Sequence, residues 1–86
     1  MSNIFYIQGF DDYLKIYMKE QKPYLVRLTM KAILEKVPAT FIRVHRSYIV
    51  SLNYVDGVRN KIISLANEQI PIGNIHEEAF MKSFSK

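Results

Sequence analysis

The chain has no cysteine, and it has only three glycines and three prolines in 86 residues. Without cysteine there is no disulfide framework, no thiol nucleophile and no cysteine-based zinc site. No apolar run approaches the length of a membrane span, and the opening residues MSNIFYIQGF lack the basic flank and long apolar stretch of a signal peptide. We therefore expect a cytoplasmic protein with no membrane partner.

Length and composition predict one small globular domain. Two independent cores in 86 residues would each bury too little apolar surface. Apolar residues make up 49% of the chain and charged residues 23%, which is typical of a folded domain and not of a disordered tail. The net charge of +4 suits a polyanionic partner. Charge alone does not decide the matter, because many small basic domains bind no nucleic acid.

Short apolar or alternating segments dominate and predict a mainly β protein. In Tyr13–Met18, for example, Leu14 and Ile16 share one face, and Tyr13, Lys15 and Tyr17 share the other, which we expect to be wet. Turns are expected at Gly9–Asp12, at Arg59–Asn60 and at Asn67–Glu68. The expected strands are Ile4–Gln8, Tyr13–Met18, Tyr24–Leu28, a strand from Phe41, Tyr48–Leu52 (buried on both sides), Val55–Arg59, Ile62–Leu65 and Gln69–Ile72.

Two short helices are predicted. The internal one is capped by Thr29, buries Met30, Ile33, Leu34 and Val37 at helical spacing, and ends before Pro38. The second lies near the carboxyl end. There Asn74 can cap the helix, with Glu77 completing a capping box, and we expect Ile75, Ala79 and Phe80 to face inward.

The segment from Phe41 to Val50 has an odd pattern. If its first strand continued, Arg46 would share the core face with Ile42 and Val44, where an unpaired guanidinium is costly. The chain must therefore turn at about His45 to Ser47, which raises a histidine, an arginine and a hydroxyl on one short loop. An arginine can fork onto a phosphate or onto guanine O6 and N7, and an imidazole can bond to a base edge.

This segment, FIRVHRSYIVSLNYV, is similar to the central signature of LytTR domains: phenylalanine, an apolar residue, arginine, valine, His-Arg-Ser and an apolar run. Upstream, IFYIQGFDDYLKIY resembles the family's opening strand pair, and TMKAILEKVPATF resembles its short helix. Downstream, ISLANEQIPIG resembles its penultimate hairpin. The resemblance spans Ile4 to about Phe84, in the family's order and spacing.

The resemblance implies a small sandwich of short antiparallel strands with one internal and one C-terminal helix, filling residues 4–86. It implies an output domain of a bacterial two-component response regulator that controls transcription. Such domains insert loops into successive major grooves of duplex DNA at promoter direct repeats, and the DNA bends; a dimer on DNA is expected for the full-length regulator. By position, Tyr13 and Lys15 match the first DNA-facing segment, His45 with Arg46 the second, and Asn74 the third.

The chain departs from the family pattern in two places. Many members have serine and a basic residue where this chain has Gly73 and Asn74, although asparagine can still bond adenine. Family domains usually begin with a further strand, and here only Met-Ser-Asn precedes Ile4, with no receiver domain. We therefore expect a fragment of a longer regulator. We also expect Ile4–Ile7 or a neighbouring strand to be an unpaired edge that favours self-association.

Other interpretations of these residues stay open. His45 and Arg46 can close onto a nearby carboxylate, Tyr13 can be half-buried sheet surface, and Asn74 can serve only as a cap. We expect no enzyme, cofactor or metal, because one loop supplies no oxyanion hole or positioned acid, and His45 with His76 makes no ligand cluster. The rival function is a protein-interaction module that uses a sheet edge, whose binding would depend little on salt.

Overall fold

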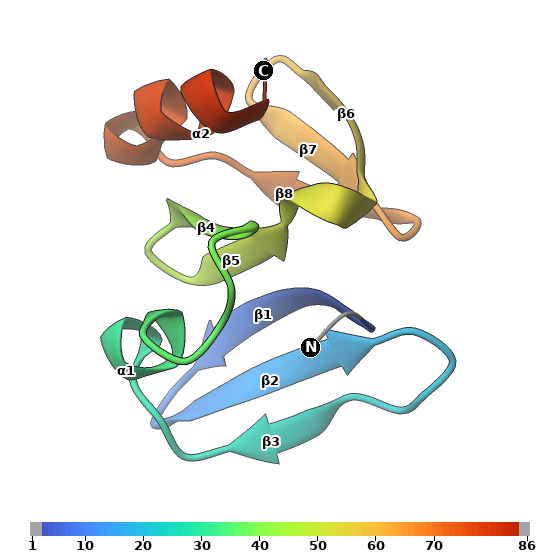
Figure 1. The fold of residues 1–86 in the computed structure, drawn as a ribbon, viewed down its shortest axis with the longest axis vertical. Helices are drawn as coiled ribbons and strands as arrows, with labels where there is room; N and C mark the ends of the chain where they lie inside the picture. Colours follow the sequence, from blue (N-terminus) through green and yellow to red (C-terminus); the bar gives the residue numbers. More distant parts are fainter. Residues whose placement is uncertain (1–2, 85–86) are drawn as a thin grey trace.

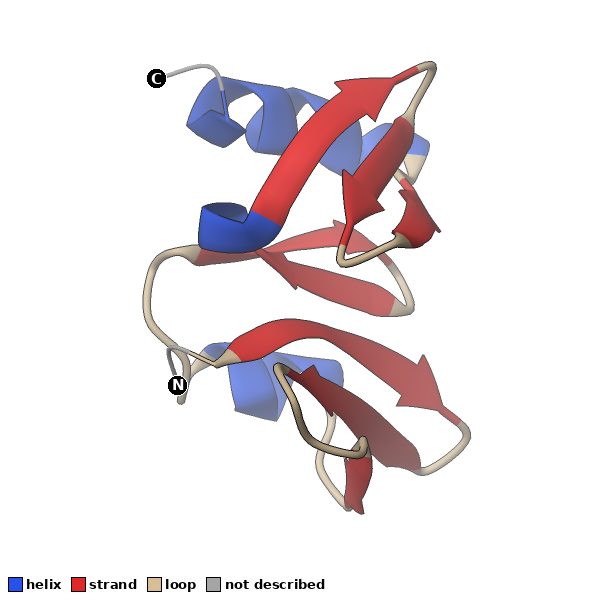
Figure 2. Ribbon diagram, turned by 90° about the vertical axis from the view of Figure 1, so that its right-hand side faces the viewer, coloured by secondary structure: helices blue, strands red, loops and turns tan. Residues whose placement is uncertain are grey.

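Two antiparallel sheets form most of the protein in the computed structural model, which describes residues 3–84 (Figure 1; strands in red in Figure 2). The five-stranded sheet has the order β3-β2-β1-β5-β4, and the three-stranded sheet has the order β6-β7-β8. Their strands are β1 (Ile4–Phe10), β2 (Tyr13–Met18), β3 (Tyr24–Val26), β4 (Phe41–His45), β5 (Tyr48–Ser51), β6 (Val55–Arg59), β7 (Ile62–Leu65) and β8 (Glu68–Pro71). The helices are α1 (Met30–Leu34) and α2 (Glu77–Phe84), with 3₁₀ turns at Leu52–Tyr54 and Asn74–His76.

The five-stranded sheet is covered on both faces, which divides the core into two clusters. One cluster joins it to the three-stranded sheet and α2, and contains Tyr6, Val44, Val50, Ile63, Leu65, Ile70, Ile72 and Phe80. The other joins it to α1, and contains Ile4, Ile7, Leu14, Ile16, Ile33, Phe41 and Ile49. The neighbours Ile49 and Val50 on β5 lie in different clusters and are each 0% exposed, which explains the unbroken apolar run of this strand.

The mainly β sandwich expected from the sequence is confirmed, and most errors are at strand ends. Three strands, β2, β6 and β7, have the predicted bounds. β1 runs two residues further than predicted, so only Asp11 and Asp12 form its turn, and β3 ends two residues earlier. The β6–β7 and β7–β8 turns each place two residues at positive φ, Asn60 with Lys61 and Ala66 with Asn67. The first turn lies one residue later in the chain than predicted, and the second lies one residue earlier.

The prediction that the first strand is an unpaired edge was wrong. β1 lies in the middle of its sheet, with β2 on one side and β5 on the other. The second partner is β5, whose Ile49 and Val50 are buried on opposite faces of the sheet and which can bury both only inside the sandwich, where its backbone pairs with β1. The edges of this sheet are β3 and β4.

Both helices are shorter than predicted. The Thr29 hydroxyl oxygen accepts from the Ala32 N–H at 3.0 Å, which confirms this cap, but regular helix ends at Leu34. At the carboxyl end, Asn74 does not cap α2 but opens a 3₁₀ turn. The core-facing side of α2 carries Phe80 and Phe84, so the prediction that Ile75 and Ala79 face inward was also wrong. No helix in residues 3–84 is long and apolar enough to cross a membrane.

Candidate functional site

Three chain reversals lie on the same side of the molecule, at the left in Figure 1. They are the β1–β2 turn (Asp11–Asp12), the β4–β5 turn (Arg46–Ser47) and the β8–α2 connection (Gly73–His76), and we call them together the loop edge. Two backbone hydrogen bonds anchor two of these loops to the strands beside them. The Gly9 N–H donates to Ser47 O, and the Gly73 N–H donates to Val44 O, each at 2.7 Å. The β4–β5 turn is therefore fixed between its two neighbours.

The turn predicted at His45 to Ser47 is present and exposes the Arg46 side chain. β4 ends at His45, and the residue before it, Val44, is buried in the core. The His45 Nδ1 accepts from the Ser47 N–H at 3.1 Å. The neutral imidazole therefore carries its proton on Nε2, which leaves that atom as a hydrogen-bond donor.

Arg43 supports this turn and was not identified from the sequence. Its Nε donates to the carbonyl oxygen of His45 at 3.3 Å, and its Nη2 donates to the carbonyl oxygen of Arg46 at 2.7 Å. One guanidinium thus holds the two carbonyls at the start of the turn. The only sign of this role in the sequence was the position of Arg43, two residues before His45 and three before Arg46.

The third predicted loop residue, Asn74, is held by a lysine from another hairpin. The Lys61 Nζ donates to Asn74 Oδ1 at 2.7 Å and forms an ion pair with Glu77 at 3.4 Å. The side-chain oxygen of Asn74 is engaged, and its amide group remains a donor. Lys61 lies in the β6–β7 turn, 13 residues away in sequence, so no local pattern could have linked it to Asn74.

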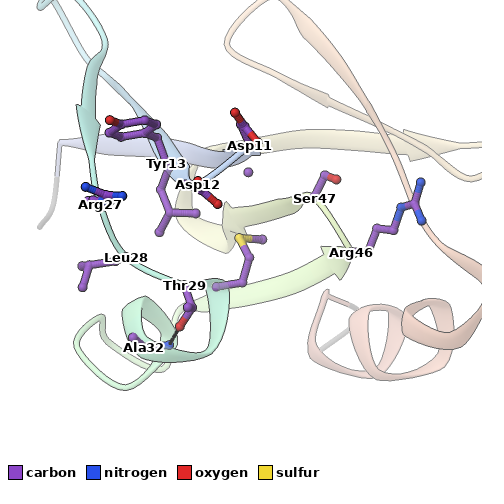
Figure 3. A pocket seen from close by; sticks show the side chains of 12 residues that line it. Asp11, Asp12, Tyr13, Arg27, Leu28, Thr29, Ala32, Arg46 and Ser47 are labelled. Carbon is purple, nitrogen blue, oxygen red and sulfur yellow. Dashed lines mark hydrogen bonds between the residues drawn. The ribbon is translucent and has the colours of Figure 1, made fainter.

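A surface hollow of about 620 Å³ separates the β1–β2 turn from the β4–β5 turn (Figure 3). Tyr13 and Arg27 lie on one side of it, and Ser47 and Arg46 lie on the other. The Arg27 guanidinium carbon is 5.8 Å from the centre of the Tyr13 ring, within cation–π range. Tyr13 is 41% exposed, so the prediction that it lies on the surface holds. Arg27 was missed because nothing in the sequence marked its contact with Tyr13.

A second hollow of about 210 Å³ lies between the β4–β5 turn and the β8–α2 connection. His45, Arg46, Asn74, Ile75 and His76 line it together with Gly73. Partial burial lowers the pKa of His76, and the nearby Arg43 and His45 lower it further. Its surroundings therefore favour the neutral imidazole of His76 over the charged form. Three of the five residues predicted from the sequence, His45, Arg46 and Asn74, meet at this hollow.

Lys15 lines neither hollow but shares a row with His45 across the sheet face. In this row Lys15 pairs with Gln8, Gln8 with Tyr48, and Tyr48 with His45. Gln8 donates to the Tyr48 hydroxyl at 3.3 Å and accepts from the Tyr17 hydroxyl at 3.0 Å. The Lys15 Nζ lies 5.5 Å from the centre of the Tyr17 ring. The face of β2 that carries Tyr13, Lys15 and Tyr17 was expected to be exposed to solvent. It is only partly exposed, because Tyr17 stacks on Tyr6.

Comparison with families and with solved structures finds LytTr DNA-binding domains. The family model of the LytTr DNA-binding domain matches residues 1–85. The fold is similar to a solved LytTr DNA-binding domain of a methyl-accepting/DNA response regulator from Bacillus cereus, with a TM-score of 0.85 and 23% sequence identity, over 94% of this chain and 80% of that one. No curated protein matches. Residues 3–84 contain no group of three or more side chains that could hold a metal ion.

Proposed function

This chain belongs to the LytTR DNA-binding domain family, and we propose on this basis that it binds duplex DNA sequence-specifically through its loop edge. The observation that carries the proposal is the pair of 2.7 Å backbone hydrogen bonds that anchor the β4–β5 turn to β1 and the β8–α2 connection to β4. They present Arg46 at the centre, with His45 and Asn74 beside it. Loops that are ordered before they meet the DNA favour tight binding, since ordering loops during binding costs affinity.

The charges in and beside the loop edge fit a groove between two phosphate backbones. Arg27, Arg46 and Lys61 supply cations that can neutralise phosphates and release counterions. Asp11 and Asp12 would repel phosphates, so we place their turn inside the major groove. There a carboxylate can accept a hydrogen bond from cytosine N4.

Each predicted site residue has a role that its contacts allow. The exposed guanidinium of Arg46 forks onto guanine O6 and N7, and His45 donates from Nε2 to a base edge or a phosphate. Asn74 donates from its amide, and it reads adenine through both atoms only if Lys61 releases its oxygen. Tyr13 and Lys15 contact the backbone next to the first turn.

Size supports a bend in the DNA. The longest dimension of the domain is 30 Å. Successive major grooves on one face of straight DNA are about 34 Å apart. The domain is therefore slightly shorter than this spacing, and a bend of the DNA toward the protein would bring two successive grooves closer to the β1–β2 turn and the β8–α2 connection. Such a bend costs a few kcal/mol, which the added contacts must offset.

In the cell, we propose that this domain is the cytoplasmic output half of a two-component response regulator. It would control transcription by binding promoter direct repeats as a dimer of the full-length regulator. Residues 4–86 would form this domain; of these, residues 85 and 86 lie outside the described part of the chain.

The test is a fluorescence anisotropy titration of duplexes selected by the protein from a random library, at two ionic strengths. We expect affinity to fall steeply with salt, because several phosphates are neutralised. Arg46→Ala should lose about 1–3 kcal/mol on the selected duplex. The matched control, Lys22→Ala, removes one exposed positive charge from the β2–β3 loop. This loop lies at the opposite end of β2 from the loop edge, at the right in Figure 1, so the variant should bind DNA like the wild type. Salt-independent binding, or no binding to any duplex, would refute the proposal.

The exposed edge of β3 favours a second candidate function, protein binding by strand addition. Tyr24 and Leu25 are 47% and 55% exposed on this edge strand. A partner strand or a second copy could pair with its free side. Such binding would change little with salt and would be unaffected by Arg46→Ala, and sedimentation at increasing protein concentration would detect self-association.

A further inference from the structure

Ile75 is the most exposed large apolar side chain in the described part of the chain. It is 89% exposed, whereas every other isoleucine in residues 3–84 is buried or half-buried. A single exposed isoleucine is ordinary on a protein surface. This one is notable because it lies in the loop edge, between the polar residues Asn74 and His76.

The backbone around Ile75 is fixed although its side chain is free of the core. The Gly73 N–H is bonded to Val44 O on one side, and the His76 N–H donates to Gly73 O at 3.0 Å. Lys61 holds the neighbouring Asn74 side chain. Ile75 also lines the 210 Å³ hollow together with His45 and Arg46. The side chain therefore projects from a rigid support, next to the residues proposed to read bases.

We propose that Ile75 is a specificity-determining residue that packs against the C5-methyl group of a thymine, an inference that rests on the proposed DNA binding. The thymine methyl is the apolar feature of the major-groove base edges. An isoleucine cannot form a side-chain hydrogen bond with a phosphate or a base, so its gain comes from covering apolar surface. Its β-branched side chain has few rotamers to lose when it becomes ordered.

This role complements that of its neighbours. Arg46 and His45 offer hydrogen-bond donors, which suit guanine, and neither distinguishes thymine from cytosine by an apolar contact. Ile75 would make that distinction at a neighbouring base pair. Phe10 and Tyr13, 55% and 41% exposed, offer apolar surface at the other end of the loop edge.

The experiment removes the methyl group from the DNA and the side chain from the protein in turn. Duplexes selected by the wild-type protein are resynthesised with each dT replaced singly by dU, which lacks only the methyl group. Dissociation constants are then measured for the wild-type protein and for Ile75→Ala. Met81→Ala, which truncates a 41% exposed side chain on α2, is the matched control.

We expect one or two positions at which dU weakens wild-type binding about fourfold, the effect of one buried carbon group. At those positions Ile75→Ala should bind dT and dU duplexes equally, while Met81→Ala behaves like the wild type. The melting temperature of Ile75→Ala should be unchanged, because the side chain is 89% exposed.

Two results would overturn the inference while leaving DNA binding intact. The first is a wild-type dissociation constant that does not change when dU replaces dT at any position. The second is an Ile75→Ala variant whose dissociation constant still rises with dU as much as that of the wild type. A variant that instead loses self-association would show that Ile75 contacts protein. If the wild-type protein selects no duplex, the proposed function itself fails, and the inference fails with it.

Discussion

Replacing Arg43 with lysine should weaken specific DNA binding without removing a charge. In the wild type, Arg43 holds the carbonyl oxygens of His45 and Arg46 at 3.3 and 2.7 Å with two different nitrogens. A lysine has a single ammonium group on a flexible stem and cannot reproduce this fork. We expect the β4–β5 turn of Arg43→Lys to sample other conformations before it binds.

The magnitude follows from the two hydrogen bonds. Each contributes about 0.5–1.5 kcal/mol net, and the lower half of the range applies here because water can reach the turn. The loss of both then costs about 1–2 kcal/mol of loop ordering, which binding must supply. Since 1.4 kcal/mol corresponds to a factor of ten, specific affinity should fall by about 5- to 30-fold.

The assay compares the selected duplex with a random duplex at several salt concentrations. Arg43→Lys should lose affinity for the selected duplex, keep its affinity for the random one and retain the wild-type salt slope. Arg43→Ala should lose specific affinity to the same degree or more. If Arg43→Lys matched the wild type on both duplexes, the support of the turn by Arg43 would be refuted. A reduced salt slope for Arg43→Ala with an unchanged sequence preference would make Arg43 a phosphate contact instead.

Three further predictions concern stability. Val44→Ala should lower the free energy of unfolding by about 1–3 kcal/mol in urea titration, because Val44 is 0% exposed, whereas Arg46→Ala should leave it unchanged. Phe80→Ala should cost about 3–5 kcal/mol, since this ring joins α2 to the core; a loss below 1 kcal/mol would contradict that packing. His76 has a folded pKa below its ordinary value of 6.5, so the unfolded state binds more protons, and stability falls as the pH drops through 6.5. The melting temperature of His76→Gln should therefore fall less than that of the wild type between pH 7 and pH 6.

Several features of the fold could be predicted because their causes are local. Alternation of apolar residues predicted β2 with its observed bounds, and turn chemistry between short segments predicted β6 and β7 with theirs. The Thr29 cap follows from one side chain and the first turn of the helix. The turn after His45 could be predicted because a continued strand would bury Arg46. The family, too, was recognisable from ordered motifs along the chain.

The remaining features depend on contacts between distant segments. No local pattern could place β1 in the centre of its sheet, because that position depends on β5 pairing with it from about 40 residues away. The same holds for Lys61, which reaches Asn74 from another hairpin and takes the oxygen that a helix cap would have used.

Strand content, the turn that exposes His45 and Arg46, and the family could be inferred from the sequence, because periodicity, turn chemistry and motif order are properties of neighbouring residues. Three features could be seen only in the folded molecule: which loops share an edge, the support of the central turn by Arg43, and the exposure of Ile75, whose helical spacing had predicted burial. These features depend on backbone hydrogen bonds between loops and distant strands and on the packing of Phe80 of α2 into the core, which are set by the whole fold and leave no local trace in the chain.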